Sequence, residues 1–295
     1  MTPQPDTDLM PVNVDTSDGV ESIYARAARQ GAQWLDTAEC SQRDFAPANT
    51  VQTSNWGGWQ IGGGTAPRNH YVQGAWNVPV VTLPAAHSPA NTYLSGTWVG
   101  LGGGIYVDDV SAAHPLIQAG TEEIVDSISG AATYYFFHEV WPEPPKLFTN
   151  IPIAPGDEVA ADVFWMPKYN AAQLAVCNFT QNVCLNFYNT NVQDQYGDVL
   201  ASSVGEPGNT TEWIHEPASN SSMPAFSQIN FNNACWASTT TYDFPVTGDQ
   251  LTGSVTCLPM TEGPSLLPLQ SVANIYATPS TIGSTGSDFY IYNGN

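Results

Sequence analysis

From residue 51 to the end of the chain, short apolar and aromatic runs alternate with clusters of Gly, Pro, Asn and Ser. Within these runs apolar and polar residues tend to alternate with a period of two, which is typical of β-strands that bury one face. The clearest runs are 70–81, 91–102, 132–141, 157–166, 174–189, 225–236 and 288–295. Their spacing predicts an all-β domain over residues 51–295, in which two antiparallel sheets pack as a β-sandwich.

The first 50 residues have a different pattern and predict a short N-terminal helical extension. Apolar residues recur there at helical spacing, and Ser17 is a candidate N-cap. The apolar face consists of Val20, Ile23, Tyr24, Ala27, Gly31, Trp34 and Leu35. We weigh a helix that packs on the outside of the domain against an inhibitory pro-segment whose arginines meet an acidic cleft. The first is preferred, because acidic residues outnumber arginines in residues 1–50.

The chain carries few charges, and most of them are negative. Of its 295 residues 27 are acidic and 6 are basic, which gives a net charge of −21 at pH 7. At low pH the carboxylates lose their charge, and a chain with so few cations then avoids the positive self-repulsion that unfolds proteins in acid. This composition suits life in acid, and an ordinary acidic secreted protein is the equal alternative. Nucleic acid and anionic membranes are not expected as partners, because the sequence offers them no basic patch.

Cysteine content and apolar runs bear on the compartment. No run approaches the length of a transmembrane helix, and the first ten residues lack the basic and apolar regions of a signal peptide. The cysteines are Cys40, Cys177, Cys184, Cys235 and Cys257. Cys177 and Cys184 flank a turn-like segment, and Cys235 and Cys257 can join neighbouring strands. Cys40 is left over. Two disulfides suit an exported protein, although spacing does not fix connectivity. We expect a secreted monomer.

The stretch NTTEWIHEPAS (209–219) places Glu212 and Glu216 four residues apart in a chain that has few charges. If this stretch is a strand, both carboxyl groups lie on one face, while Trp213 and His215 lie on the other. A carboxylate on a packed face costs free energy unless it is paired, protonated or used in chemistry. The pattern therefore calls for a structural or a catalytic explanation.

Several familiar catalytic signatures are absent from the sequence. It contains no G-x-S-x-G elbow, no HExxH zinc helix, no paired Asp-Thr-Gly turns and no paired CxxC motif. The segment VGLGGG (99–104) follows a predicted strand and indicates a tight loop rather than a phosphate cradle. The remaining candidates are polar residues on predicted strands: Gln118, Glu139, Glu212 and Glu216. Each of them alone is more often structural than catalytic.

Ordered motifs from Thr53 onward resemble the glutamic peptidases, also called eqolisins, whose mature domain starts with S-N-W-G-G. The motifs are TSNWGG (53–58), VQGAWNVP (72–79), GTWVGLGG (96–103), LIQAG (116–120), HEVWPE (138–143), IAPGDEV (153–159), TEWIHEPAS (211–219) and MPAFSQINFNNA (223–234). Matches in the same order over one whole domain are far more specific than any single motif. The resemblance implies a concanavalin A-like jelly-roll sandwich, in agreement with the strand pattern.

The resemblance also implies an acid-acting endopeptidase that cleaves protein or peptide substrates with a Gln/Glu dyad and without a metal or other cofactor. The family's glutamine corresponds to Gln118 and its glutamate to Glu212, with Thr211 in place of the usual alanine. With an ordinary pKa of about 4, Glu212 would activate water and return the proton to the leaving nitrogen. The amide of Gln118 would donate to the oxyanion.

Other residues are expected to support the dyad in the cleft. The family's active-site tryptophan corresponds to Trp98, and Trp56 and Trp141 are further candidate cleft aromatics. Glu139 and Glu216 are interpreted as supporting carboxyl groups that share protons or hydrogen bonds, so that they titrate as a coupled set.

One departure from the family pattern affects the dyad. Gly102 and Gly104 stand where the family has two acidic residues, so Gln118 loses an expected anchor, and Glu122 or Glu123 is the candidate replacement. These glycines favour an alternative function, a lectin-like or peptide-binding module that is weakly active or inactive. A structural surface protein is a third interpretation, supported only by the composition rich in Ser, Thr, Asn and Gln.

Overall fold

The computed structural model describes residues 13–15, 47, 49–62, 69–104, 115–141, 143–167, 171–190, 208–218, 220–238 and 254–294. Within these ranges nearly all regular structure is β-strand, and the one helical element is a short 3-10 turn, η3 (Met260–Glu262). No helix in the described part of the chain is long and apolar enough to span a bilayer. The predicted amphipathic helix and its cap at Ser17 lie outside the described residues.

The strands are β1 Asn13–Asp15, β2 Val51–Thr53, β3 Gly57–Gly62, β4 Tyr71–Asn77, β5 Val81–Thr82, β6 Tyr93–Leu101, β7 Ile117–Val125, β8 Ala132–Val140, β9 Lys146–Phe148, β10 Glu158–Met166, β11 Ala171–Asn178, β12 Val183–Thr190, β13 Thr210–Pro217, β14 Ala225–Phe226, β15 Ile229–Ala237, β16 Ser254–Thr256, β17 Leu258–Pro259, β18 Leu267–Ser271, β19 Tyr276–Pro279 and β20 Phe289–Gly294. Strands β4, β6, β8, β10, β11, β12, β15 and β20 coincide with the clearest runs in which the sequence predicts strands, and β13 coincides with 209–219, whereas β1 and β16 to β19 lie outside the predicted runs.

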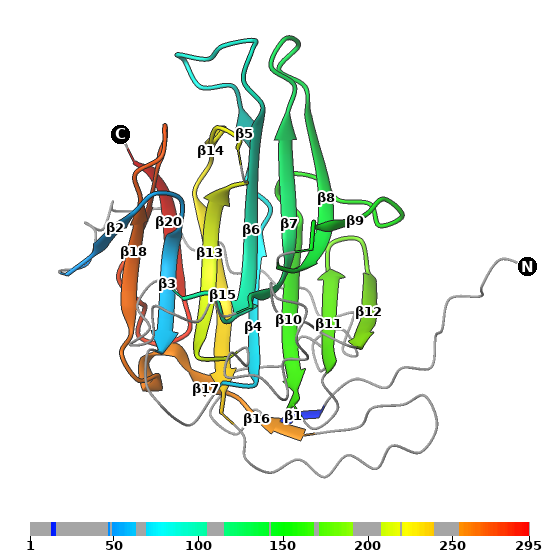
Figure 1. Cartoon of the computed structure of the whole chain (residues 1–295), viewed down its shortest axis with the longest axis vertical. Coiled ribbons are helices and arrows are strands. Elements are labelled where there is room, and N and C mark those ends of the chain that lie inside the picture. Colours follow the sequence, from blue (N-terminus) through cyan, green and yellow to red (C-terminus); the bar gives the residue numbers. More distant parts are fainter. Residues whose placement is uncertain are drawn as a thin grey trace, which may run out of the picture.

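Most of these strands form one continuous sheet that folds over on itself. Its order is β12-β11-β10-β4-β15-β20-β19-β18-β3-β13-β6-β7-β8-β9, with β17 beside β15 and β2 beside β18. Strands β4, β10 and β11 contact β6, β7 and β13, so the two halves of the sheet pack as two layers. Figure 1 shows β3, β13, β6, β7 and β8 side by side in one of these layers. The predicted antiparallel β-sandwich is confirmed, with β2–β18 as a parallel pair at the edge.

The core between the layers is built from the side chains that the period of two turns inward. Trp76, Trp165 and Trp213 are fully buried there. The indole of Trp213 donates from Nε1 to the carbonyl oxygen of Gln73 at 2.7 Å, which satisfies a polar group that would otherwise be costly inside the sandwich. Residues at odd positions of β13 thus hold the layers together, while the even positions face away from the core.

Two disulfides tie neighbouring segments together. Cys177 and Cys184 bond across the β11–β12 hairpin, and Cys235 of β15 bonds to Cys257, directly before β17. Both pairs join residues that the sequence places near one another, and Cys40 lies outside the described residues. The division at residue 50 stays a prediction, although β1 from the first segment pairs with β16 of the second.

Candidate active site

Four neighbouring strands bring most of the predicted site residues into two rows on one face of the sheet. Directly opposed residues in antiparallel strands share a face. The first row runs across β13, β6, β7 and β8 through Glu212, Gly100, Gln118 and Glu139. The second row, four residues further along each strand, runs through Glu216, Gly96, Glu122 and Tyr135. Each row has a glycine on β6, so no side chain separates β13 from β7.

An aromatic floor lies between the two rows. Trp98 occupies the middle of β6 and is 1% exposed, and its ring meets Trp56 edge-to-face with centroids 5.2 Å apart. Opposite Trp98, a Cβ atom on Gly120 would lie 2.1 Å from the carbonyl oxygen of Thr97 and 2.7 Å from Trp98. Glycine at this position therefore allows the close approach of β7 to the backbone of β6 beside Trp98.

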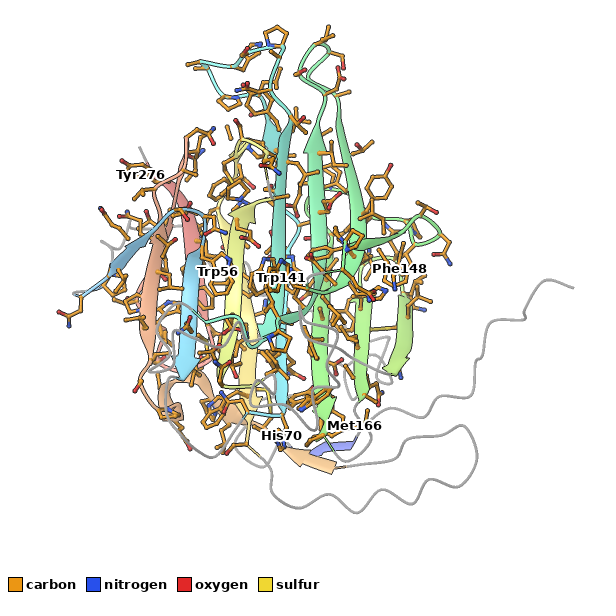
Figure 2. The ribbon with its side chains drawn as sticks, in the orientation of Figure 1. Trp56, His70, Trp141, Phe148, Met166 and Tyr276 are labelled. Atoms are coloured by element: carbon orange, nitrogen blue, oxygen red, sulfur yellow. A yellow bond between two sulfur atoms is a disulfide. The ribbon has the colours of Figure 1, made fainter. Side chains whose placement is uncertain are left out.

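This face opens into a cleft of about 1300 Å³. Seven of the eight predicted site residues line it: Trp56, Trp98, Gln118, Glu122, Glu139, Trp141 and Glu216. Trp141 is 41% exposed at the rim, and Figure 2 shows it and Trp56 on the side of the sheet that faces the viewer. Among the described residues no group of three or more His, Cys, Asp and Glu is placed to hold a metal ion.

Glu212 is the predicted site residue that does not line the cleft. It shares the cleft face with Glu216, but its side chain is completely buried, which corrects the expectation that both glutamates face an open groove. Beside it, the amide of Gly102 donates to the carbonyl oxygen of Thr210 at 3.0 Å, and a Cβ atom on Gly104 would lie 2.2 Å from Cγ2 of Thr210. The glycine turn 102–104 thus packs closely on the strand next to Glu212.

The environment of Glu212 also changes its protonation. Burial raises the pKa of Glu212 well above its ordinary value, and the hydroxyl of Thr210 opposes this only in part. Within the described part of the chain, neither carboxyl oxygen has a hydrogen-bond partner at good geometry. The expectation of an ordinary pKa near 4 is therefore wrong for this conformation, because a desolvated carboxylate loses the hydration that keeps it charged.

Gln118 is anchored by a residue that the sequence assigned only a supporting role. Its Nε2 donates to Oε2 of Glu139 at 2.5 Å, whereas its buried Oε1 has no partner among the described residues. Burial raises the pKa of Glu139, and the hydrogen bond from Gln118 acts in the opposite direction. The anchor that replaces the family's acidic residue is therefore Glu139, and neither Glu122 nor Glu123 bonds to Gln118.

The carboxyl group of Glu216 is held on two sides. Its Oε2 accepts from Nδ2 of Asn55 at 2.7 Å, and its Oε1 accepts from Nε1 of Trp98 at 3.0 Å. Burial nevertheless raises the pKa of Glu216 to about 7, with a further contribution from the charge of Glu139. Burial and then Glu139 likewise raise the pKa of Glu122 to about 7. Both groups interact with Glu139, so the cleft carboxyls titrate as a set, as predicted.

A second polar cluster lies behind these rows, between the layers, and it holds Glu123, which was expected beside Gln118. Glu123 is completely buried and accepts hydrogen bonds from the hydroxyls of Thr121 at 2.7 Å, Ser95 at 3.0 Å and Thr97 at 3.4 Å. Thr97 also bonds to Nδ1 of the buried His215 at 2.9 Å. The sequence pattern could have predicted that Glu123 lies between the layers. Glu122 and Glu123 are adjacent in one strand, so their side chains must lie on opposite faces of the sheet.

Fold and site together define a class of protein: a two-layer β-sandwich hydrolase whose cleft is lined by glutamates, one glutamine and aromatic rings. The chain belongs to the peptidase A4 family, whose model matches residues 54–256. It is a glutamic endopeptidase and acts on protein or peptide substrates. The sequence-based resemblance to the eqolisins is therefore confirmed.

One solved structure supports the same fold, and a second resembles the chain less closely. Scytalido-glutamic peptidase, in a crystal structure with a transition state analog inhibitor, is 17% identical, covers 82% of this chain and 98% of its own, and gives a TM-score of 0.55. Aspergilloglutamic peptidase from Aspergillus niger is 20% identical over 68% of this chain and 99% of its own, with a TM-score of 0.43. No curated protein sequence matches the chain significantly. Because scytalido-glutamic peptidase is only 17% identical to this chain, the similarity between the two structures shows a shared fold and nothing more.

Proposed function

We propose that this endopeptidase works in acid with Gln118 and Glu212 as its catalytic dyad. One observation carries the proposal. The two residues flank Gly100 in a single row. Within the described ranges, three of the buried polar atoms without a partner are Oε1 of Gln118 and both carboxyl oxygens of Glu212. Buried polar atoms are nearly always paired in folded proteins, so several unpaired atoms in one row indicate groups that are kept for a ligand.

The chemistry of the dyad follows from the donors and acceptors present. As a carboxylate, Glu212 takes a proton from the attacking water and returns it to the leaving nitrogen. The amide nitrogen of Gln118 carries two N–H groups, of which Glu139 accepts one, so the other can donate to the oxyanion. A donor of this kind lowers the barrier by about 3 kcal/mol. Because an amide does not titrate, this donor persists at low pH.

The proposal requires that Glu212 becomes accessible to one water molecule during the reaction. In the structure Glu212 is completely buried. The turn at Gly102–Gly104 packs on its neighbour Thr210, and it is the described segment whose displacement would expose this end of the row. Access of water and entry of substrate are therefore expected to be coupled.

An acidic working range follows from the cleft carboxyls. Burial raises the pKa of Glu122 and of Glu216 to about 7, so both are uncharged in acid and become charged as the pH rises through neutrality. Negative charges on Glu122 and Glu216 disfavour a carboxylate at Glu212 and so raise the pKa of Glu212 further. The same charges repel the oxyanion. The reaction needs Glu212 ionised while its neighbours hold their protons, so hydration of Glu212 on displacement of the turn must bring its pKa below theirs. This condition gives a bell-shaped pH profile.

Site-directed variants test the dyad. Glu212→Gln and Gln118→Ala are each expected to lower kcat for a denatured protein substrate near pH 4 by at least about a hundredfold, with unchanged melting behaviour at that pH. Glu262→Gln, which removes an exposed glutamate of η3, is the matched control. If both dyad variants remain as active as the parent, the assignment is wrong. If the parent binds peptides but never cleaves them, the chain works as a binding module instead.

The two disulfides also lead us to infer export, because such bonds persist in oxidising compartments. A monomeric state stays a prediction, which sedimentation of the purified protein at pH 4 would test.

A further inference from the structure

Gly96 differs from the other glycines on the cleft face. A Cβ atom on Gly100 would lie 2.8 Å from Trp98, and one on Gly120 would lie 2.1 Å from the carbonyl oxygen of Thr97, so packing requires glycine at both positions. A Cβ atom on Gly96 would meet nothing closer than 3.5 Å, and its backbone does not adopt a positive φ. A Cβ atom at position 96 would make ordinary van der Waals contacts, so neither packing nor backbone conformation requires glycine there. Gly96 lines the cleft without a side chain, and this leaves a gap between the side chains on either side of it.

The walls of this gap are two carboxyl groups and two aromatic rings. Glu216 and Glu122 are the direct neighbours of Gly96 on β13 and β7, so their Cα atoms are about 10 Å apart, two strand spacings. The atoms nearest to the missing Cβ are Cδ1 of Trp98 at 3.5 Å and Cε1 of Phe137 at 3.7 Å. Glu122 is only 8% exposed and lines the cleft, and no hydrogen bond counters the effect of burial on its carboxyl group.

Within the part of the chain that the structure describes, no protein cation balances these carboxyl groups. The described residues that line the cleft include no Lys, Arg or His. Lys146 is the one Lys or Arg within the described ranges, and it lies on the surface, 3.5 Å from Glu143. When Glu122 ionises, a cation from outside the protein is therefore the counter-charge that the cleft can receive.

We propose that the gap over Gly96 is a subsite for a cationic side chain of the substrate, Lys or Arg, whose charged end lies between Glu122 and Glu216. The aliphatic stem of such a residue fits along Trp98 and Phe137, since long cationic side chains bury their stems on apolar surfaces and their charged ends interact favourably with aromatic rings. This inference rests on the proposed function, because the residue bound here belongs to the peptide that is cleaved.

The proposal makes the preference for cations depend on pH. The groups that face Glu122 are Glu139 and Tyr135 on β8 and Glu216 on β13, with Glu123 behind the sheet. Burial raises the pKa of Glu122 and of Glu216 to about 7, so in acid a cation must displace a proton to form its ion pair. Its advantage over a neutral side chain should therefore grow with pH, by up to about tenfold per pH unit below pH 7.

Paired peptides test this on the full chain. A neutral parent peptide is synthesised with Lys, norleucine or Ala at each position around the scissile bond, and kcat/KM is measured at pH 3.5, 4.5 and 5.5. At one position the ratio of Lys to norleucine should rise several-fold or more over this range. Glu122→Gln should make that ratio independent of pH, whereas Glu262→Gln should keep the rise. Because both peptides are cleaved by the same variant, a general loss of activity cancels in the ratio of their kcat/KM values.

A second variant tests the gap itself. Gly96→Ala places a methyl group at the base of the gap and should lower kcat/KM for the Lys and norleucine peptides more than for the Ala peptide. Gly283→Ala is the matched control, because its Cβ would also meet its nearest atom at 3.5 Å, but in an exposed loop outside the cleft.

Three results would overturn the subsite: a ratio that is flat with pH at every position, a rise that persists in Glu122→Gln, or Gly96→Ala that cleaves all the peptides as well as the parent. Failure of the parent to cleave any peptide would instead overturn the proposed function, and the subsite with it.

Discussion

Replacing Glu123 by Gln should change how the stability of the fold depends on pH. Glu123 lies between the layers, fully buried, where three hydroxyl groups bond to its carboxyl. Glutamine has nearly the same shape, stays neutral at every pH, and can bond to the same hydroxyls, which both donate and accept. The substitution therefore removes a titration and keeps the packing.

The magnitude follows from the shift in pKa. Burial, opposed by the hydroxyls of Thr121, Ser95 and Thr97, raises the pKa of Glu123 from 4.5 to about 8. The folded state thus holds a proton that the unfolded chain releases above pH 4.5. The stabilising contribution is fully present below that pH and is lost as the pH rises toward 8. At about 1.4 kcal/mol per pKa unit, Glu123 alone lowers the free energy of unfolding by roughly 5 kcal/mol over this range.

Urea unfolding, followed by tryptophan fluorescence at pH 4.5, 6, 7 and 8, measures this effect. Glu123→Gln should differ from the parent by no more than about 1 kcal/mol at pH 4.5 and should be more stable by about 4 to 5 kcal/mol at pH 8. Glu262→Gln, exposed on η3, should follow the parent throughout. A difference between Glu123→Gln and the parent that stays constant from pH 4.5 to 8 would show that Glu123 does not hold its proton in the folded state.

Two further predictions concern the acid side and the disulfides. Burial lowers the pKa of His215 to about 3, so its stabilising contribution is present above about pH 6.5 and is lost as the pH falls toward 3. His215→Gln should therefore lose less stability than the parent between pH 6.5 and 3, as melting temperatures would show. Replacing Cys235 and Cys257 by Ala should lower the free energy of unfolding by about 3 kcal/mol, because the bond closes a loop of 22 residues. The Cys177–Cys184 pair closes a loop of only 7 and should matter less in the same urea titration.

Much of the site could be derived from local pattern. Alternation along 209–219 placed Glu212 and Glu216 on one face and Trp213 on the other, and the register of β13 confirms this. The aromatic residues expected in the cleft, Trp56 and Trp141, do line it. The prediction for 209–219 succeeded because a strand's period of two depends on backbone geometry alone. Trp56 and Trp141 lie just outside the strands, so alternation does not explain their place in the cleft.

Predictions about partners across strands were less successful. Sequence reasoning treated Glu122 and Glu123 as interchangeable anchors for Gln118. In the structure Glu139, from the neighbouring strand, holds Gln118, while Glu122 faces the cleft and Glu123 the core. Hydrogen bonds between strands depend on register, which separated segments of a chain do not specify by themselves.

The sequence by itself determined most of the strands, the face on which their side chains lie, and most of the glutamates and aromatic residues that line the cleft. Only the tertiary structure decided how deep each carboxyl lies. Glu212 and Glu216 are four residues apart on one strand, yet one is completely buried beside a glycine turn and the other lines the cleft. The physical reason is that desolvation comes from atoms that distant segments bring close, so identical side chains on the same strand can have different protonation and different access to water.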